Sequence, residues 1–257
     1  MVEKNRTTTY SPLRDNVLDV AFYLQRIGGG KLENYAQVCF LKWAIEKRIL
    51  ILENDSLIKR APTTMFFLTE DRMEEESVES LLWNILLEAA DEKNKIIDQE
   101  LKNIVKEEAL LFVSLENKLT NDSKNFLIEN GFLVEKERRL LYFNLKTSQH
   151  STTKGEKLYN HLKEYFHYLE DLIDQNFDLK NEIESWEEVF TWISLFGLAD
   201  KVYNKMKKIP SQQLDIPTGM PKQLIETYKK LAPFLDSFSI GFTYASNSMN
   251  SGRSCCV

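Results

Sequence analysis

Residues 28–60 read GGGKLENYAQVCFLKWAIEKRILILENDSLIKR, and this stretch determines the fold that we expect for the first part of the chain. The three glycines end one helix. A second helix follows, and its apolar residues repeat at the spacing of one helical face: Leu32, Ala36, Cys39, Phe40 and Trp43. Arg48 to Glu53 and Leu57 to Arg60 are short extended runs, and Asn54-Asp55-Ser56 between them has the composition of a turn.

The segment before the glycines is also helical in its spacing. Ser11-Pro12 suits the start of a helix, and apolar residues then repeat every three to four positions: Leu13, Val17, Val20, Ala21 and Leu24. Helix, turn, helix and hairpin is the order of a winged helix. We therefore predict a winged-helix-like unit over residues 1–68.

An acidic connector over residues 69–110 follows, and we expect it to be helical almost throughout. Its apolar residues form two stripes: Val78, Leu81, Leu82, Ile85, Leu86 and Ala89, then Ile97, Leu101, Ile104 and Val105. Leu119 to Gly131 predicts a helix that ends at a glycine, and Phe132 to Leu145 predicts a hairpin that turns at Lys136 to Arg139. These two features predict a second winged-helix-like unit over residues 111–146.

A polar link from Lys146 to Thr153 leads to a C-terminal helical domain, residues 153–236. Its helices are marked by three apolar series: Leu158, Leu162, Tyr165, Phe166, Leu169 and Ile173; Trp186, Val189, Phe190 and Ile193; and Ala199, Val202, Met206 and Ile209. A last helix covers about Pro221 to Leu235, and residues 237–257 predict a flexible tail. The expected fold class is mainly α, with one or two small winged-helix-like units and a C-terminal helical bundle.

Charge and cysteine content limit the function. The net charge is −6, whereas a domain that neutralises nucleic-acid phosphates usually carries a basic excess. The three cysteines, Cys39, Cys255 and Cys256, cannot form a disulfide framework, which favours a reducing compartment. The first nine residues lack the apolar core of a signal peptide, and no apolar run is long enough to span a bilayer. We therefore expect a cytoplasmic protein.

Motifs of catalysis are not found. Gly28-Gly29-Gly30-Lys31 invites comparison with a phosphate-binding loop, but such a loop follows a strand and carries a hydroxyl after the lysine; here a helix precedes it and Leu32 follows. His161 and His167 are six residues apart on one predicted helix, so they point in different directions and do not form a metal site. We predict no catalytic, cofactor-binding or metal-binding residue, and no enzymatic activity.

The helix around Trp186 to Phe196 has two interpretations. Trp186, Val189, Phe190 and Ile193 have the spacing of a core stripe. The off-stripe Trp192 and Leu195 could instead mark a surface that docks on a partner. In that interpretation the contact residues are Trp186, Phe190, Trp192 and Phe196. The acidic helices between Glu70 and Glu108 are a second candidate contact surface.

A DNA-binding regulator is the alternative function. In a winged helix the second helix enters the major groove and the wing contacts the backbone. The candidate reading helix, Leu32 to Lys47, offers a mixed set of polar residues: Glu33, Asn34, Gln37, Lys42 and Glu46. The second candidate wing is more basic, through Lys136, Arg138 and Arg139.

The C-terminal region carries a family resemblance. Thr153-Lys154-Gly155-Glu156-Lys157-Leu158-Tyr159, then Trp186-Glu187, then Gly197-Leu198-Ala199-Asp200-Lys201-Val202 resemble the C-terminal part of the YciQ-like predicted bacterial membrane proteins. A Thr-x-x-Gly element opens a helix in that family. Tyr10 to Glu53 is similar to the family's cytoplasmic winged-helix segment.

The resemblance implies a cytoplasmic helical module of uncharacterised function that is tethered to the membrane in the family. The polar link from Lys146 to Thr152 stands where the family has paired membrane helices, so we expect a stand-alone relative. The leading hypothesis is a non-enzymatic protein-interaction module that docks on a membrane-associated partner. The resemblance carries over no catalytic residue.

Overall fold

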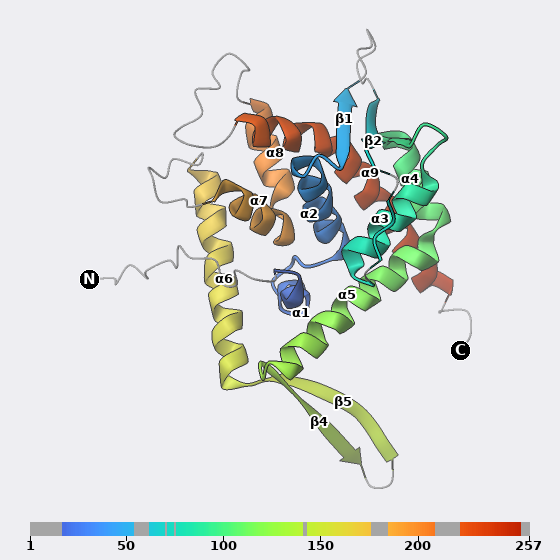
Figure 1. The fold of residues 1–257 in the computed structure, drawn as a ribbon. Helices are drawn as coiled ribbons and strands as arrows, with labels where there is room; N and C mark the ends of the chain where they lie inside the picture. The colour runs from blue at the N-terminus through green and yellow to red at the C-terminus, as the bar shows by residue number, and fades with distance from the viewer. Residues whose placement is uncertain are drawn as a thin grey trace.

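The described part of the chain is mainly α-helical, with two small antiparallel sheets, as the sequence predicts (Figure 1). The structure is a computed structural model that describes residues 17–53, 62–69, 71–74, 76–140, 143–175, 185–208 and 222–252. In Figure 1 helix α2 lies near the centre of the molecule, and the long helices α5 and α6 run along two sides of it and meet at a hairpin.

The N-terminal elements follow the expected order of helix, turn, helix and hairpin. A 3-10 turn, η1 (Val17–Val20), leads into α1 (Ala21–Gln25), and α2 (Leu32–Ile45) follows the glycine turn. Strands β1 (Ile49–Glu53) and β2 (Thr63–Phe67) form the hairpin. The second described strand begins at Thr63. The predicted run of residues 57–60 lies outside the described part of the chain, as does Leu13.

The acidic connector contains a strand that the sequence did not predict. Helix α3 (Val78–Ala89) is followed by β3 (Lys95–Ile97), α4 (Asp98–Glu107) and α5 (Ala109–Glu129). Strand β3 pairs with β2, with Thr64 opposite Ile97 and Phe66 opposite Lys95, so the sheet order is β1-β2-β3. The predicted units 1–68 and 69–110 thus share one sheet, because β3 supplies a partner for the open edge of β2.

The second hairpin is longer than predicted and turns at a different place. Strands β4 (Leu133–Leu140) and β5 (Phe143–Ser151) pair over their whole length. Residues 136–139 lie within β4, and most of the predicted polar link lies in β5. A ribbon that projects from the helices, as this one does in Figure 1, can carry polar side chains on both faces, so its sequence shows little apolar alternation.

The last four helices are α6 (Thr153–Asp174), α7 (Trp186–Leu195), α8 (Ala199–Lys208) and α9 (Lys222–Gly252). Helix α9 extends through most of the predicted flexible tail, and only residues 253–257 of that tail lie outside the described part. Phe238, Phe242 and Ala245 are buried. Gly241 lets α9 pack closely on α4, since a Cβ there would lie 2.9 Å from the Lys102 carbonyl oxygen. The prediction of a tail from residue 237 is wrong because these few apolar residues find partners in α4 and α2.

A single hydrophobic core joins all these parts, so the predicted domains are not separate bodies. Its aromatic rings pack mostly edge to face. The ring centroids of Trp43 and Trp83 are 4.9 Å apart, and the ring centroid of Phe238 lies 5.5 Å from that of Phe112 and 6.1 Å from that of Phe40. Such pairs contribute roughly 0.5–1.5 kcal/mol each beyond their buried area. Among the described helices, none is both long and apolar enough to cross a membrane.

Candidate functional site

The predicted contact residues of the Trp186–Phe196 helix are in the core. Trp186, Phe190, Trp192 and Phe196 are all buried. Trp192 packs edge to face on Tyr165 of α6 at 5.8 Å, and Phe190 packs on Tyr228 of α9 at 5.2 Å. The prediction that these side chains form a partner surface is wrong, because α6 and α9 cover α7 on two sides. A helix that is apolar on most sides is usually buried, and α7 follows that rule.

Helix α2 cannot act as a DNA-reading helix in this structure. Nine of its fourteen residues are buried, including Asn34, and α7 and α9 pack against it. Lys42 is exposed, but its Nζ lies 2.8 Å from the Glu79 carboxylate. The prediction of a groove-reading face on Leu32 to Lys47 is therefore wrong: this helix is apolar nearly all round, which is typical of a central helix.

The predicted basic wing is part of the projecting hairpin. Lys136 is exposed on β4. Arg138 and Arg139 belong to the same strand, opposite Leu145 and Asn144, but their side chains lie outside the described part of the chain. A nucleic-acid role for these three residues stays a prediction.

The residues that carry the family resemblance have structural roles here. The element that opens α6 is Thr152-x-x-Gly155, in which Thr152 Oγ1 accepts a hydrogen bond of 3.1 Å from the Gly155 N–H. Thr152 Oγ1 also donates to the Gly131 carbonyl at 2.8 Å. Near the other end of α6, Lys201 pairs with Asp174 at 3.2 Å. These contacts hold the hairpin, α6 and α8 together.

The outer face of the three-stranded sheet exposes large apolar side chains. Leu50 and Leu52 of β1 are 45% and 43% exposed, and Leu68, just after β2, is 55% exposed. Ile49 and Ile51, which alternate with them, point into the core. Because successive strand residues face opposite sides, Leu50, its cross-strand neighbour Phe66, and Leu68 share one face. We call Leu50, Leu52 and Leu68 the sheet surface.

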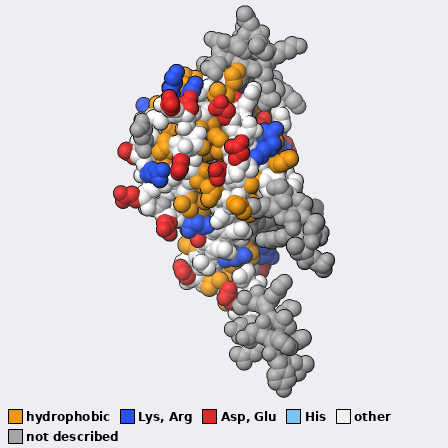
Figure 2. All heavy atoms as spheres, turned by 90° about the vertical axis from the view of Figure 1, so that its right-hand side faces the viewer, with side chains coloured by type: hydrophobic (Ala, Val, Ile, Leu, Met, Phe, Trp, Pro, Cys, Tyr) orange, Lys and Arg blue, Asp and Glu red, His pale blue; other side chains and the backbone are white. Residues whose placement is uncertain are grey.

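A shallow acidic hollow of about 310 Å³ lies at the other edge of this sheet. We call it the acidic hollow; it is lined by Ala89, Asp91, Lys95, Glu100, Asn103, Ile104 and Glu107. Desolvation opposes ionisation of Asp91, but hydrogen bonds from the Lys93 and Lys95 N–H groups hold the pKa of its carboxyl below the usual value. Figure 2 shows the side of the molecule on which α3 and α4 lie, where apolar side chains gather in a band flanked by acidic ones.

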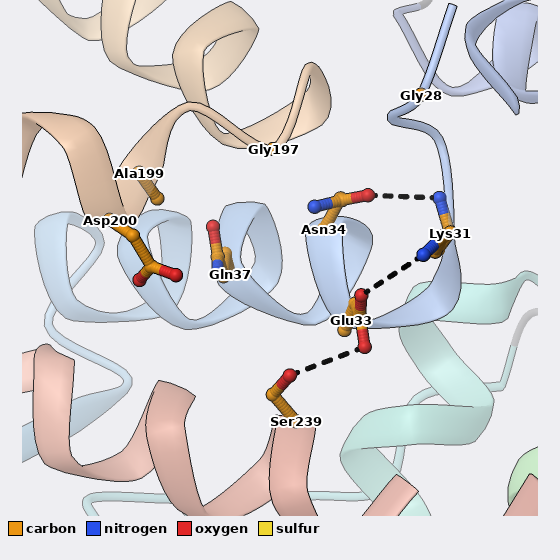
Figure 3. A pocket seen from close by; sticks show the side chains of 9 residues that line it. All are labelled: Gly28, Lys31, Glu33, Asn34, Gln37, Gly197, Ala199, Asp200 and Ser239. Atoms are coloured by element: carbon orange, nitrogen blue, oxygen red, sulfur yellow. Dashed lines mark hydrogen bonds and ion pairs between the residues drawn. The ribbon is translucent and has the colours of Figure 1, made fainter. Parts of the chain in front are cut away.

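A polar pocket of about 240 Å³ lies at the N-terminal end of α2 (Figure 3). We call it the α2 pocket. Three segments that are distant in the sequence form it: the glycine turn with the start of α2, the turn between α7 and α8, and the middle of α9. Its lining residues are Gly28, Lys31, Glu33, Asn34, Gln37, Gly197, Ala199, Asp200 and Ser239.

Two backbone turns pack together and fix this pocket. The Gly30 N–H donates to the Leu195 carbonyl at 2.8 Å. At Gly29 a Cβ would lie only 2.3 Å from the same oxygen, so only glycine fits there. Gly197, with φ of 72°, reverses the chain between α7 and α8. The glycines that resemble a phosphate loop in sequence therefore serve close packing of two turns.

The side chains of the α2 pocket form an incomplete hydrogen-bond network. Asn34 Oδ1 accepts from the Lys31 N–H at 3.0 Å, and Glu33 accepts from Ser239 Oγ at 3.3 Å. Lys31 Nζ is 3.8 Å from Glu33 Oε1. Gln37 Oε1 is buried and has no hydrogen-bond partner among the described residues. In the sequence, Glu33, Asn34 and Gln37 are candidates only for DNA contacts, and their place in a largely apolar helix is the one local hint of another role.

The described residues include no group of three His, Cys, Asp or Glu side chains that could hold a metal ion. Burial raises the pKa of the Cys39 thiol, so it is protonated and inert at neutral pH.

No family model, curated protein or solved structure matches the chain.

Proposed function

We propose that this chain is a non-enzymatic protein-interaction module that docks a partner segment on the sheet surface and in the acidic hollow. The observation that carries the proposal is the exposure of Leu50, Leu52 and Leu68 on one side of a small sheet. Single exposed apolar residues are ordinary, whereas neighbouring ones on one face are typical of an interaction site.

The chemistry of the surface indicates the kind of partner. Phe66 lies opposite Leu50 in β1 and opposite Lys95 in β3, and Lys95 lines the acidic hollow. The apolar and acidic parts are therefore neighbours across one strand. They fit an extended segment in which apolar residues adjoin lysines or arginines.

A partner at the membrane fits this chemistry. The cytoplasmic loops of membrane proteins carry an excess of Lys and Arg next to apolar spans, and the net charge of this chain is −6. The resemblance to the cytoplasmic part of YciQ-like proteins supports the same location. In this proposal the chain is cytoplasmic and reaches the membrane through its partner.

The test is fluorescence anisotropy with defined probes. One peptide alternates valine with lysine, a second replaces each lysine with glutamate, and a short DNA duplex is the third probe. We expect the basic peptide to bind and the acidic one not to bind. A Leu50→Lys/Leu52→Lys variant should weaken binding of the basic peptide by about tenfold or more.

Val134→Lys is the matched control, since Val134 is an exposed apolar strand residue on the separate hairpin β4–β5. It should leave the peptide affinity unchanged. Equal binding of both peptides, or an equal loss in the control, would contradict the proposal. Binding of the duplex alone would place the DNA-binding regulator first, with the hairpin residues Lys136, Arg138 and Arg139 as its candidate contacts.

A further inference from the structure

We infer that the α2 pocket binds a small molecule through a primary ammonium group that has an oxygen atom close to it. This ligand is independent of the partner segment proposed above, because the pocket is built by the start of α2, the α7–α8 turn and α9 rather than by the sheet. Its volume of about 240 Å³ is below the range of roughly 300–1,000 Å³ that is usual for drug-sized ligands.

Asn34 offers a hydrogen-bond donor to the pocket. This side chain is only 5% exposed, and its Oδ1 is occupied by the Lys31 N–H. Its Nδ2 points into the pocket (Figure 3). Buried polar groups in native proteins are nearly always hydrogen-bonded. An oxygen atom of a ligand can accept a hydrogen bond from this amide.

The rest of the pocket requires donors and positive charge. Gln37 Oε1 is an acceptor without a partner among the described residues, and the lining has two carboxylates, those of Glu33 and Asp200, but one ammonium group, that of Lys31. In Figure 3 the Asp200 carboxylate and the Asn34 amide approach Gln37 from opposite sides. A primary ammonium has three N–H donors on a compact head, so it can serve several of these oxygens at once.

The site is prepared before the ligand arrives. Gly29 and Gly30 hold the α1–α2 turn against the α7–α8 turn by a backbone hydrogen bond of 2.8 Å and by contact too close for any Cβ. A rigid site avoids the cost of ordering its side chains on binding. We therefore expect the same pocket in the free and bound protein.

The experiment is ligand-observed NMR with three matched probes. Ethanolamine has both the ammonium and the nearby oxygen, propylamine lacks the oxygen, and choline keeps the oxygen and the charge but has no N–H donor. We expect ethanolamine to bind most tightly, propylamine more weakly and choline not at all. The inference would be overturned if choline bound as tightly as ethanolamine, or if none of the three probes bound.

Two variants assign the signal to this pocket. Asp200→Asn removes one carboxylate and should weaken ethanolamine binding by about tenfold, whereas Asp171→Asn, an exposed acid on α6, should not change it. Gln37→Leu should weaken binding as well, and should raise the melting temperature, because it removes a buried oxygen that lacks a partner. A variant that lost binding only because it was destabilised would have a lower melting temperature, not a higher one. Unchanged ethanolamine affinity in both variants would refute the assignment.

Discussion

The hydroxyl of Tyr23 in α1 donates a hydrogen bond of 3.1 Å to the carbonyl oxygen of Phe132, which precedes β4. The same carbonyl accepts from the Thr152 N–H at 2.9 Å. The N-terminal helix, the hairpin and α6 therefore meet at one oxygen atom. Gly155 packs against this point, and its substitution tests how much the junction contributes to stability.

Gly155→Ala should destabilise the fold by about 1–3 kcal/mol or more. The added Cβ would lie 2.0 Å from the Phe132 oxygen and 2.4 Å from Tyr23 Oη, and one contact is with backbone that cannot easily move. Urea unfolding followed by circular dichroism measures the change. Glu156→Ala, at the exposed next position, is the control and should stay within about 0.5 kcal/mol of the parent. A similar small value for Gly155→Ala would show that the junction differs in solution.

Trp192→Ala should lower the free energy of unfolding by about 3–5 kcal/mol, because the indole is fully buried against Tyr165 and Phe196. Thermal and urea unfolding both report this loss. Thr191→Ala, the neighbouring half-buried residue, is the control and should have a much smaller effect. If Trp192→Ala were as stable as the parent and lost only a binding partner, the contact-surface interpretation would return.

Gly241→Val should loosen α9 from α4. Glycine in a helix interior is normally unfavourable by about 0.5–1 kcal/mol relative to alanine, so an added side chain would ordinarily stabilise the helix. Here a Cβ would meet Lys102 O and Val105 Cβ, both at 2.9 Å, and we expect a loss of about 1–3 kcal/mol instead. Limited proteolysis should then cut within α9. The control is Ile240→Val, at the exposed preceding position. The protease should cleave this variant no faster than the parent.

Glu116→Gln should raise stability at neutral pH. Burial raises the pKa of the Glu116 carboxyl, although the Leu32 N–H donates to it. The folded state therefore binds this proton more tightly than the unfolded state, and stability from this group declines as the pH rises from the ordinary glutamate pKa, about 4.3, through the raised value. Glutamine keeps an acceptor for Leu32 without the charge.

The free energy of unfolding of Glu116→Gln should therefore exceed that of the parent at about pH 7, and the two should be equal below about pH 4. Urea unfolding across this range measures it. Glu129→Gln, at an exposed position near the end of the same helix, is the control and should show no such pH dependence. An advantage that is equal at both ends of the range would mean that the charge of Glu116 is not the cause.

Local patterns in the sequence predicted most of the helices. Apolar spacing placed α3, α7 and the start of α9 close to their true positions, because one covered face gives a helix a clear period. The order of the first unit followed from the glycine turn in the same way, whereas the predicted turn at residues 54–56 lies outside the described part of the chain. The mainly α fold class is confirmed.

Features that depend on distant partners were missed. Three residues, Lys95 to Ile97, form β3 only because the edge of β2 is available. The sequence left Trp192 between a core and a surface interpretation, because a helix covered on two sides has no single stripe. The α2 pocket could not be predicted, since Asn34, Asp200 and Ser239 come together only in the folded chain. The polar residues Glu33, Asn34 and Gln37 in a largely apolar helix were the local sign.

The place of α9 has a consequence for protein synthesis. This helix covers α2 and α4, yet it is translated well after both. At roughly 5–20 residues per second, the ribosome adds the residues between Ile45 and Lys222 in a time on the order of ten seconds or more. Until α9 is made, α2 and later α4 lack the final cover of their apolar sides, and a nascent chain in that state is a natural client for a chaperone that binds exposed apolar helices.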